Sequence, residues 1–102
     1  MVFASGQLGI DPEGEVPADV REQAALCFEN ALQIVKEAGM GRDDIVRINA
    51  YVTSPNYLKP YMQVRDEYIG ERPPASTLMI VTGFASPSFK VEVELVAAKV
   101  KG

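Results

Sequence analysis

Residues 19–39 read DVREQAALCFENALQIVKEAG, and this stretch decides the fold class. Its apolar residues recur at helical spacing and form one face: Val20, Ala24, Cys27, Phe28, Ala31, Leu32, Val35 and Ala38. Pro17 or Asp19 can begin the helix, and Gly39 follows its last turn, where a left-handed residue is expected. The pattern predicts an amphipathic helix that must bury one face against another layer.

The segments on either side of this helix supply the other layer. Strands are predicted over residues 2–7, 45–53, 75–81 and 90–100, where β-branched residues are frequent or alternate with polar ones. A turn is expected at residues 11–14, and a second helix over residues 57–69 with Pro60 in its first turn. Residues 71–74 are expected to form a stiff connector. The order β, α, β, α, β, β predicts one α+β domain over residues 1–102.

Two helices on one face of a four-stranded sheet leave the other face uncovered. Hydrophobic residues make up 47% of the 102 residues, and so small a domain buries only part of its apolar surface in one core. The uncovered face is expected to pack against identical subunits. The chain is therefore predicted to be a homo-oligomer.

Composition excludes several classes of function. The net charge is −4 and the basic residues are scattered, which argues against nucleic-acid binding. Histidine is absent, so the commonest metal ligand and the commonest general base are missing. No segment approaches the ~20 apolar residues of a transmembrane helix, and no leader-like run follows Met1. A cytoplasmic protein without a membrane partner is expected.

Five collinear segments resemble the RidA family, also called YjgF or L-PSP proteins. They are Val2-Phe3-Ala4-Ser5-Gly6-Gln7, Asp11-Pro12 with Gly14-Glu15, Asp44-Ile45-Val46, Tyr68-Ile69 before Pro73-Pro74-Ala75, and Val91-Glu92-Val93-Glu94. The resemblance implies a chorismate-mutase-like α+β fold with a mixed sheet and two helices on one face. It further implies a homotrimer whose sheets line an inner barrel, with small-molecule sites in the clefts between subunits.

The resemblance also implies an activity. Family members hydrolyse reactive enamine and imine intermediates to 2-oxo acids and ammonia without a cofactor, which would make this chain a hydrolase acting on C=N bonds. Others have been described as endoribonucleases or translation inhibitors, although no basic groove is evident here.

Three departures from the family pattern bear on the substrate. Deaminating members carry an arginine after the Pro-Ala element to hold the substrate carboxylate, but here Ser76 and Thr77 follow Pro74-Ala75. Losing a charged anchor costs about 2–4 kcal/mol of affinity for an anion. Met62 takes the helix position that usually offers an asparagine. The family's N-terminal strand, with its site tyrosine, would lie before Met1.

Glu92 is the candidate catalytic residue. In the family the equivalent glutamate orients the attacking water. A carboxylate can do this because it accepts one of the water's hydrogens. The other interpretation is that Glu92 and Glu94 only alternate with valines on a half-exposed strand; Glu94 is expected outside the cleft. Ser5 and Gly6 are candidate substrate-binding residues through their backbone, or else mark a bend at a strand end.

Each of the remaining candidates can also have an ordinary structural role. Met62, like Ser76 and Thr77, is a candidate substrate-binding residue, or it packs within its helix layer. Cys27 lies on the apolar helix stripe and is expected to be a buried structural thiol. Tyr51 is expected in the core or an interface. Arg47 either replaces the missing arginine or is a solvated strand residue or inter-subunit ion pair.

Two functional hypotheses remain open. The chain is a RidA-like deaminase that works without the family arginine, or it is a divergent trimeric member that binds or hydrolyses a neutral small molecule.

Overall fold

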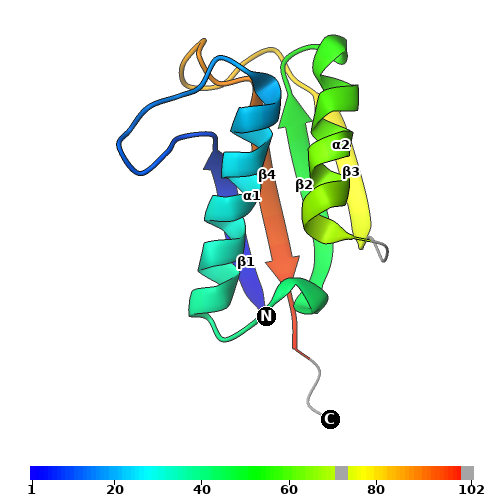
Figure 1. The fold of residues 1–102 in the computed structure, drawn as a ribbon. Coiled ribbons are helices and arrows are strands. Elements are labelled where there is room, and N and C mark those ends of the chain that lie inside the picture. The colour runs from blue at the N-terminus through cyan, green and yellow to red at the C-terminus, as the bar shows by residue number, and fades with distance from the viewer. Residues whose placement is uncertain (71–73, 100–102) are drawn as a thin grey trace.

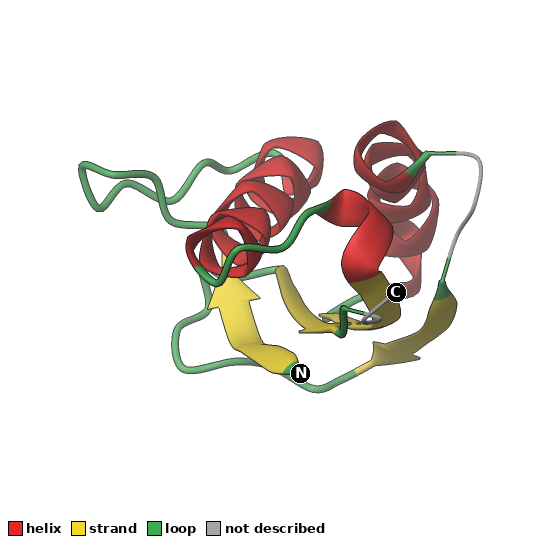
Figure 2. Ribbon diagram, turned by 90° about the horizontal axis from the view of Figure 1, so that it is seen from below, coloured by secondary structure: helices red, strands yellow, loops and turns green. Residues whose placement is uncertain are grey.

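The computed structural model describes residues 1–70 and 74–99, and it contains one sheet and two α-helices. The elements are β1 (Val2–Leu8), α1 (Val20–Glu37), β2 (Ile45–Val52), α2 (Leu58–Ile69), β3 (Ala75–Ile80) and β4 (Val91–Ala97). The strand order is β1-β4-β2-β3 (Figure 1). Both helices lie on the same face of the sheet (Figure 2). The predicted α+β class, mixed sheet and one-sided helix layer are confirmed.

Helix α1 begins and ends at the residues that the sequence indicates. The Asp19 side chain accepts a hydrogen bond of 2.8 Å from the Arg21 amide, so Asp19 rather than Pro17 caps the helix. Beyond the last turn, Gly39 has φ = +80°, a conformation that costs glycine little.

The sheet combines antiparallel and parallel pairs. Strand β4 pairs antiparallel with β1 and β2, and β3 lies parallel to β2. Helix α2 makes the connection from β2 to β3, as two neighbouring parallel strands require. Strands β1 and β3 form the two edges of the sheet.

The core lies between the helices and the sheet. Alternate residues of β4 are buried, namely Val91, Val93, Leu95 and Ala97, and the apolar stripe of α1 packs onto them. Gln23, a buried polar residue, ties three segments together: its amide nitrogen donates to the carbonyls of Pro17 (2.7 Å) and Ser88 (2.8 Å). Its Oε1 accepts from the Lys90 amide at 2.8 Å, so it fixes the entry to β4.

The face away from the helices is bare, as Figure 2 shows. Large apolar side chains remain exposed on the edge strands, including Phe3 at 68% and Met79 at 52%. This surface is the one expected to pack against other subunits.

Element ends differ slightly from the predictions. The second helix begins at Leu58 because residues 55–57 form a 3₁₀ turn capped by Ser54. The strands predicted to end at residues 53, 81 and 100 end at Val52, Ile80 and Ala97. Residues 71–73 of the predicted connector, and Val100, lie outside the described residues. Within residues 1–70 and 74–99, no helix is both long and apolar enough to cross a membrane.

Candidate functional site

Strand β1 carries a bulge at Ser5 and Gly6. Ala4 pairs with Leu95 and Gln7 with Val93, so two residues of β1 stand opposite the single residue between them on β4. A bulge re-aims side chains and leaves backbone groups outside the regular ladder. The bend that the sequence allows at Gly6 was expected at the end of the strand, whereas the bulge lies inside β1, which continues to Leu8.

Glu92 lies directly against this bulge. A Cβ atom built on Gly6 would be 2.5 Å from Glu92 Oε1 and 2.6 Å from its Cδ, so the carboxyl group occupies the space that a side chain at Gly6 would take. The pairing of β1 with β4 thus brings Gly6 against Glu92, with Ser5 next to Gly6 in the bulge.

The surroundings of Glu92 favour its neutral form. Partial burial, followed by the nearby Glu94 charge, raises the pKa of the Glu92 carboxyl group. Glu94 is two residues further along β4 and therefore on the same face of the sheet. The alternation that buries Val91, Val93 and Leu95 puts both glutamates on the bare face, as the alternating pattern of this strand indicates.

Tyr51 completes this polar patch. It stands opposite Glu92 in the pairing of β2 with β4 and is half-buried on the bare face, outside the core. Hydrogen bonding with Glu94, and then partial burial, raises the pKa of the Tyr51 hydroxyl. A phenol and two carboxyl groups therefore share one end of the bare face.

A second polar cluster lies where β2 pairs with β3. The Arg47 guanidinium donates to Thr77 Oγ1 at 2.5 Å and to Asn49 Oδ1 at 3.0 Å. Asn49 and Thr77 face each other across the pair. Arg47 is thus held on the bare face by its own chain.

Ser76 and Met62 are not brought to either cluster. Ser76 pairs with Ile48, which is buried toward the helices, so Ser76 is on the helix side of the sheet, opposite in face to Glu92. Met62, on α2, packs against the core. Strand β2 lies between Glu92 on β4 and Ser76 on β3, and the two residues are also offset by three positions along the strands. Their Cα atoms are therefore roughly 14 Å apart. One chain alone cannot bring these residues to one small ligand.

Cys27 is the buried structural thiol that the sequence predicts. It is fully buried, its Sγ donates to the Val91 carbonyl at 3.6 Å, and burial raises its pKa to about 12. A thiol held protonated in this way is not a nucleophile.

A cavity of about 420 Å³ lies beyond the end of β2. It is lined by Thr53, Thr82, Gly83, Phe84, Ser86, Pro87 and Phe89. The Thr53 amide donates to the Lys90 carbonyl at 3.1 Å, which places the cavity next to the start of β4 and close in sequence to Glu92. No group of three or more potential metal-binding side chains was found within residues 1–70 and 74–99.

Comparison with known proteins identifies the chain. The sequence profile of the family described as endoribonuclease L-PSP matches residues 1–99. This chain belongs to the L-PSP family. The resemblance to RidA, YjgF and L-PSP proteins seen in the sequence is therefore confirmed.

Individual members are similar over most of their length. TdcF of Escherichia coli strain K12, which bears the name of a reactive intermediate deaminase, is 35% identical over 104 residues, covering 97% of this chain and 79% of TdcF. A Thermotoga maritima protein assigned to the endoribonucleases has a solved structure with a TM-score of 0.89 at 31% identity, covering 97% of this chain and 79% of that one. The structure of E. coli TdcF with bound serine gives a TM-score of 0.81 at 33% identity, over 96% and 80% of the two chains.

Sequence reasoning did not assign a site role to Asn49, Tyr51 or Glu94. Their shared signal is strict alternation with buried residues on β2 and β4, which places polar side chains on one face of adjacent strands. The strand order needed to join them is not visible in an L-PSP sequence taken alone.

Proposed function

We propose that this chain hydrolyses reactive enamine or imine intermediates to carbonyl compounds and ammonia, in clefts between the subunits of a cytoplasmic homotrimer. The observation that supports this most directly is the Glu92 carboxyl group seated on the bulge at Gly6. The deaminase name carried by TdcF supports the same reaction.

Glu92 acts on water in this reaction. Its carboxylate accepts a proton from a water molecule whose oxygen adds to the carbon of the C=N bond. Glu92 passes this proton to the imine nitrogen, which gives a neutral carbinolamine. As the C–N bond breaks, the carbinolamine hydroxyl gives up its proton to the departing nitrogen and becomes the carbonyl, so the nitrogen leaves as ammonia. The balance is one imine plus one water giving one carbonyl and one ammonia, so no redox cofactor or metal is required.

The site is completed by a second subunit. Ser76 and Glu92 are roughly 14 Å apart on opposite faces of one chain, so a small substrate that touches both must lie between chains. Strand β3 is an edge strand whose residues are largely exposed, and Phe3 and Met79 leave apolar surface on the bare face. Packing of these surfaces around a threefold axis would place the substrate-binding Ser5, Gly6, Ser76, Thr77 and Met62 around clefts between subunits. The serine bound to TdcF is consistent with a ligand of this size.

Ammonia release from freshly generated 2-iminopropanoate tests the proposal. The wild-type assembly should accelerate release, and Glu92→Gln should lower the rate by about 10²–10⁴-fold, because an amide cannot accept the proton. Glu22→Gln, at an exposed position on α1, is the matched control and should retain full activity. An unaltered rate in Glu92→Gln would remove Glu92 from the reaction.

A neutral ligand is the second candidate. The cavity beyond β2 is lined by two phenylalanine rings and three hydroxyl groups, with no charged side chain, and Ser76 and Thr77 add no charge. Such a surface suits an uncharged aromatic or heterocyclic compound.

Ser76→Arg discriminates the two candidates. If the missing arginine alone limits the use of anionic imines, this variant should lower KM for 2-iminopropanoate by about 30-fold or more. Ser76→Gln, which adds a polar side chain without a charge, should not. Equal behaviour of the two variants would favour the neutral ligand. Neutral metabolites that raise the melting temperature more than 2-oxo acids do would support it directly; at 100 times its Kd a ligand adds ~2.7 kcal/mol.

A further inference from the structure

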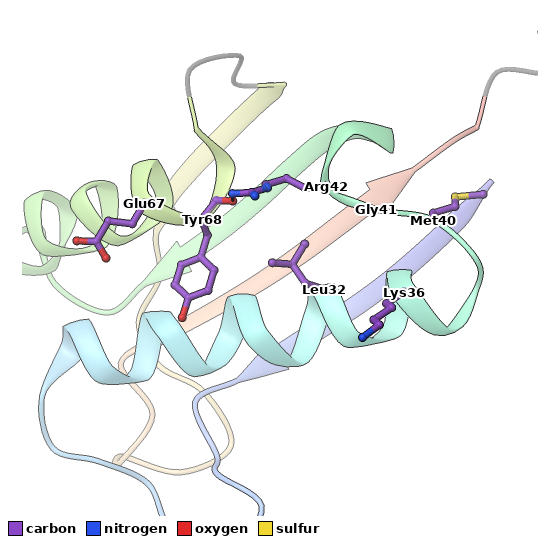
Figure 3. Close-up of a pocket in the computed structure, with 7 residues that line it drawn as sticks. All are labelled: Leu32, Lys36, Met40, Gly41, Arg42, Glu67 and Tyr68. Atoms are coloured by element: carbon purple, nitrogen blue, oxygen red, sulfur yellow. Dashed lines mark hydrogen bonds between the residues drawn. The ribbon is translucent and has the colours of Figure 1, made fainter.

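A cavity of about 350 Å³ lies in the helix layer, on the opposite side of the sheet from Glu92. It opens where the last turns of α1 and α2 meet the connector that follows α1 (Figure 3). Its lining comprises Leu32, Lys36, Met40, Gly41, Arg42, Glu67 and Tyr68. None of these residues belongs to the reaction site described above.

The apolar wall of this cavity is held in place by its neighbours. The Tyr68 ring stacks on the buried Phe28 ring, with centroids 5.7 Å apart and an interplanar angle of 11°. Its hydroxyl donates to Glu29 Oε1 at 3.0 Å, which fixes the ring in its plane. Leu32 and Met40 are half-buried against the core. A flat apolar group can therefore pack on a surface that already exists.

Arg42 provides an oriented cation beside this wall. Its Nη1 donates to the Tyr68 carbonyl at 2.7 Å, which anchors the guanidinium across the gap between the two helix ends (Figure 3). This bond uses one of five N–H donors. Among the described residues, the guanidinium makes no other hydrogen bond or ion pair, so its remaining donors can bind an anion.

The side chains that line the cavity carry one net positive charge. Lys36 and Arg42 contribute two positive charges against one from Glu67, whose carboxylate is directed away from Arg42 in Figure 3. The carbonyl ends of the two helices oppose an anion, but this effect is small at an exposed helix end, and Arg42 already pairs with one of those carbonyls.

We infer that this cavity binds a small organic monoanion with a flat or branched apolar body, such as an aryl or branched-chain carboxylate. The carboxylate takes the Arg42 donors that no described residue uses, where a guanidinium fork matches both oxygens, and Lys36 adds charge at the mouth. The apolar body packs on Leu32 and the Tyr68 ring. This site is separate from the proposed hydrolysis and does not depend on it.

Fluorine NMR with 4-fluorobenzoate tests the inference, with 4-fluorobenzyl alcohol as the uncharged comparison. The acid should bind with a Kd at least about tenfold below that of the alcohol. Arg42→Gln should raise that Kd about tenfold or more. Arg21→Gln is the matched control, because Arg21 lies at the opposite end of α1 and bonds Gln63 Oε1 at 2.6 Å, and it should leave the Kd unchanged.

Two further variants make the result decisive. Lys36 is exposed and has no hydrogen bond or ion pair among the described residues, so Lys36→Glu should not disturb the fold. It should raise the Kd of 4-fluorobenzoate, and this result stands even if Arg42→Gln disturbs the end of α2. Glu92→Gln should leave binding of the acid unchanged, which separates this site from the reaction site. The inference is overturned if the acid does not bind by about 10 mM, or if Lys36→Glu leaves its Kd unchanged. Loss of binding in Glu92→Gln would likewise overturn it.

Discussion

Replacing Gly6 by alanine adds a single methyl group at the point where the Glu92 carboxyl group contacts the bulge. The added Cβ would lie 2.5 Å from Glu92 Oε1 and 2.6 Å from Cδ, about 1 Å inside ordinary contact distance. The carboxyl group is the far end of a flexible side chain, so it can move away at small cost to folding. The expected result is a displaced carboxylate in a folded protein.

The displacement sets the size of the effect. A misplacement of about 1 Å in a catalytic group costs on the order of 10²-fold in rate, equivalent to about 2.7 kcal/mol of transition-state stabilisation. Gly6→Ala should therefore lower kcat/KM for imine hydrolysis by about 10²-fold while changing the free energy of unfolding by less than about 1 kcal/mol.

Gly41→Ala is the matched control for this experiment. A Cβ at Gly41 meets nothing within 4 Å, and its φ of −132° is open to any residue. Its activity should equal that of the wild type. If Gly6→Ala keeps full activity with its assembly mass intact, then the seating of Glu92 on the bulge has no part in the reaction.

Three other perturbations follow from the contacts. The Glu94 charge helps to raise the pKa of Glu92, and Glu92 must be ionised to accept a proton, so activity should rise with pH through that raised pKa. Glu94→Gln should shift this rise to lower pH. A pH profile of the variant that matches the wild type would contradict the coupling. The buried Tyr61 hydroxyl has no hydrogen-bond partner among the described residues. Tyr61→Phe should therefore raise the free energy of unfolding by about 1 kcal/mol and Tm by about 4–8 °C in calorimetry. A lower Tm would show that the hydroxyl group makes a hydrogen bond. Gln23→Leu leaves the Lys90 amide and the Pro17 and Ser88 carbonyls without their partner and should cost about 2–4 kcal/mol in urea unfolding, whereas a loss below about 0.5 kcal/mol would mean that the three groups find other partners.

Local patterns predicted the elements because each rests on short-range physics. Asp19 caps α1 through a side chain two residues from its donor, and Gly39 has the positive φ expected of its position. Alternation along β4 correctly separated the buried valines from the glutamates. The order of strands was not accessible in the same way, because it depends on which of several similar apolar strands pair across long loops.

The site was harder to predict than the fold because its residues are joined only by register. Ser5, Gly6 and Glu92 were each singled out, yet their contact follows from a bulge that shifts β1 against β4 by one residue. Ser76 and Thr77 are adjacent in sequence, and a strand sends them to opposite faces. Arg47 reached Thr77 only because β2 and β3 lie parallel in one particular register.

This register separates the parts of the proposed site that perform chemistry from those that select a substrate. Glu92 is positioned by β1 and β4, two strands whose pairing also carries the core residues Ala4 and Leu95. Ser76 is on β3, an edge strand that pairs with β2 alone and is largely exposed. Because Ser76 is exposed and Glu92 is held by the pairing of β1 with β4, we expect a change of charge at Ser76 to leave Glu92 in place. Under the proposed function, the two strands therefore have separate tasks: the Glu92 carboxylate on β4 activates water, and the Ser76 and Thr77 hydroxyl groups on β3 select the substrate.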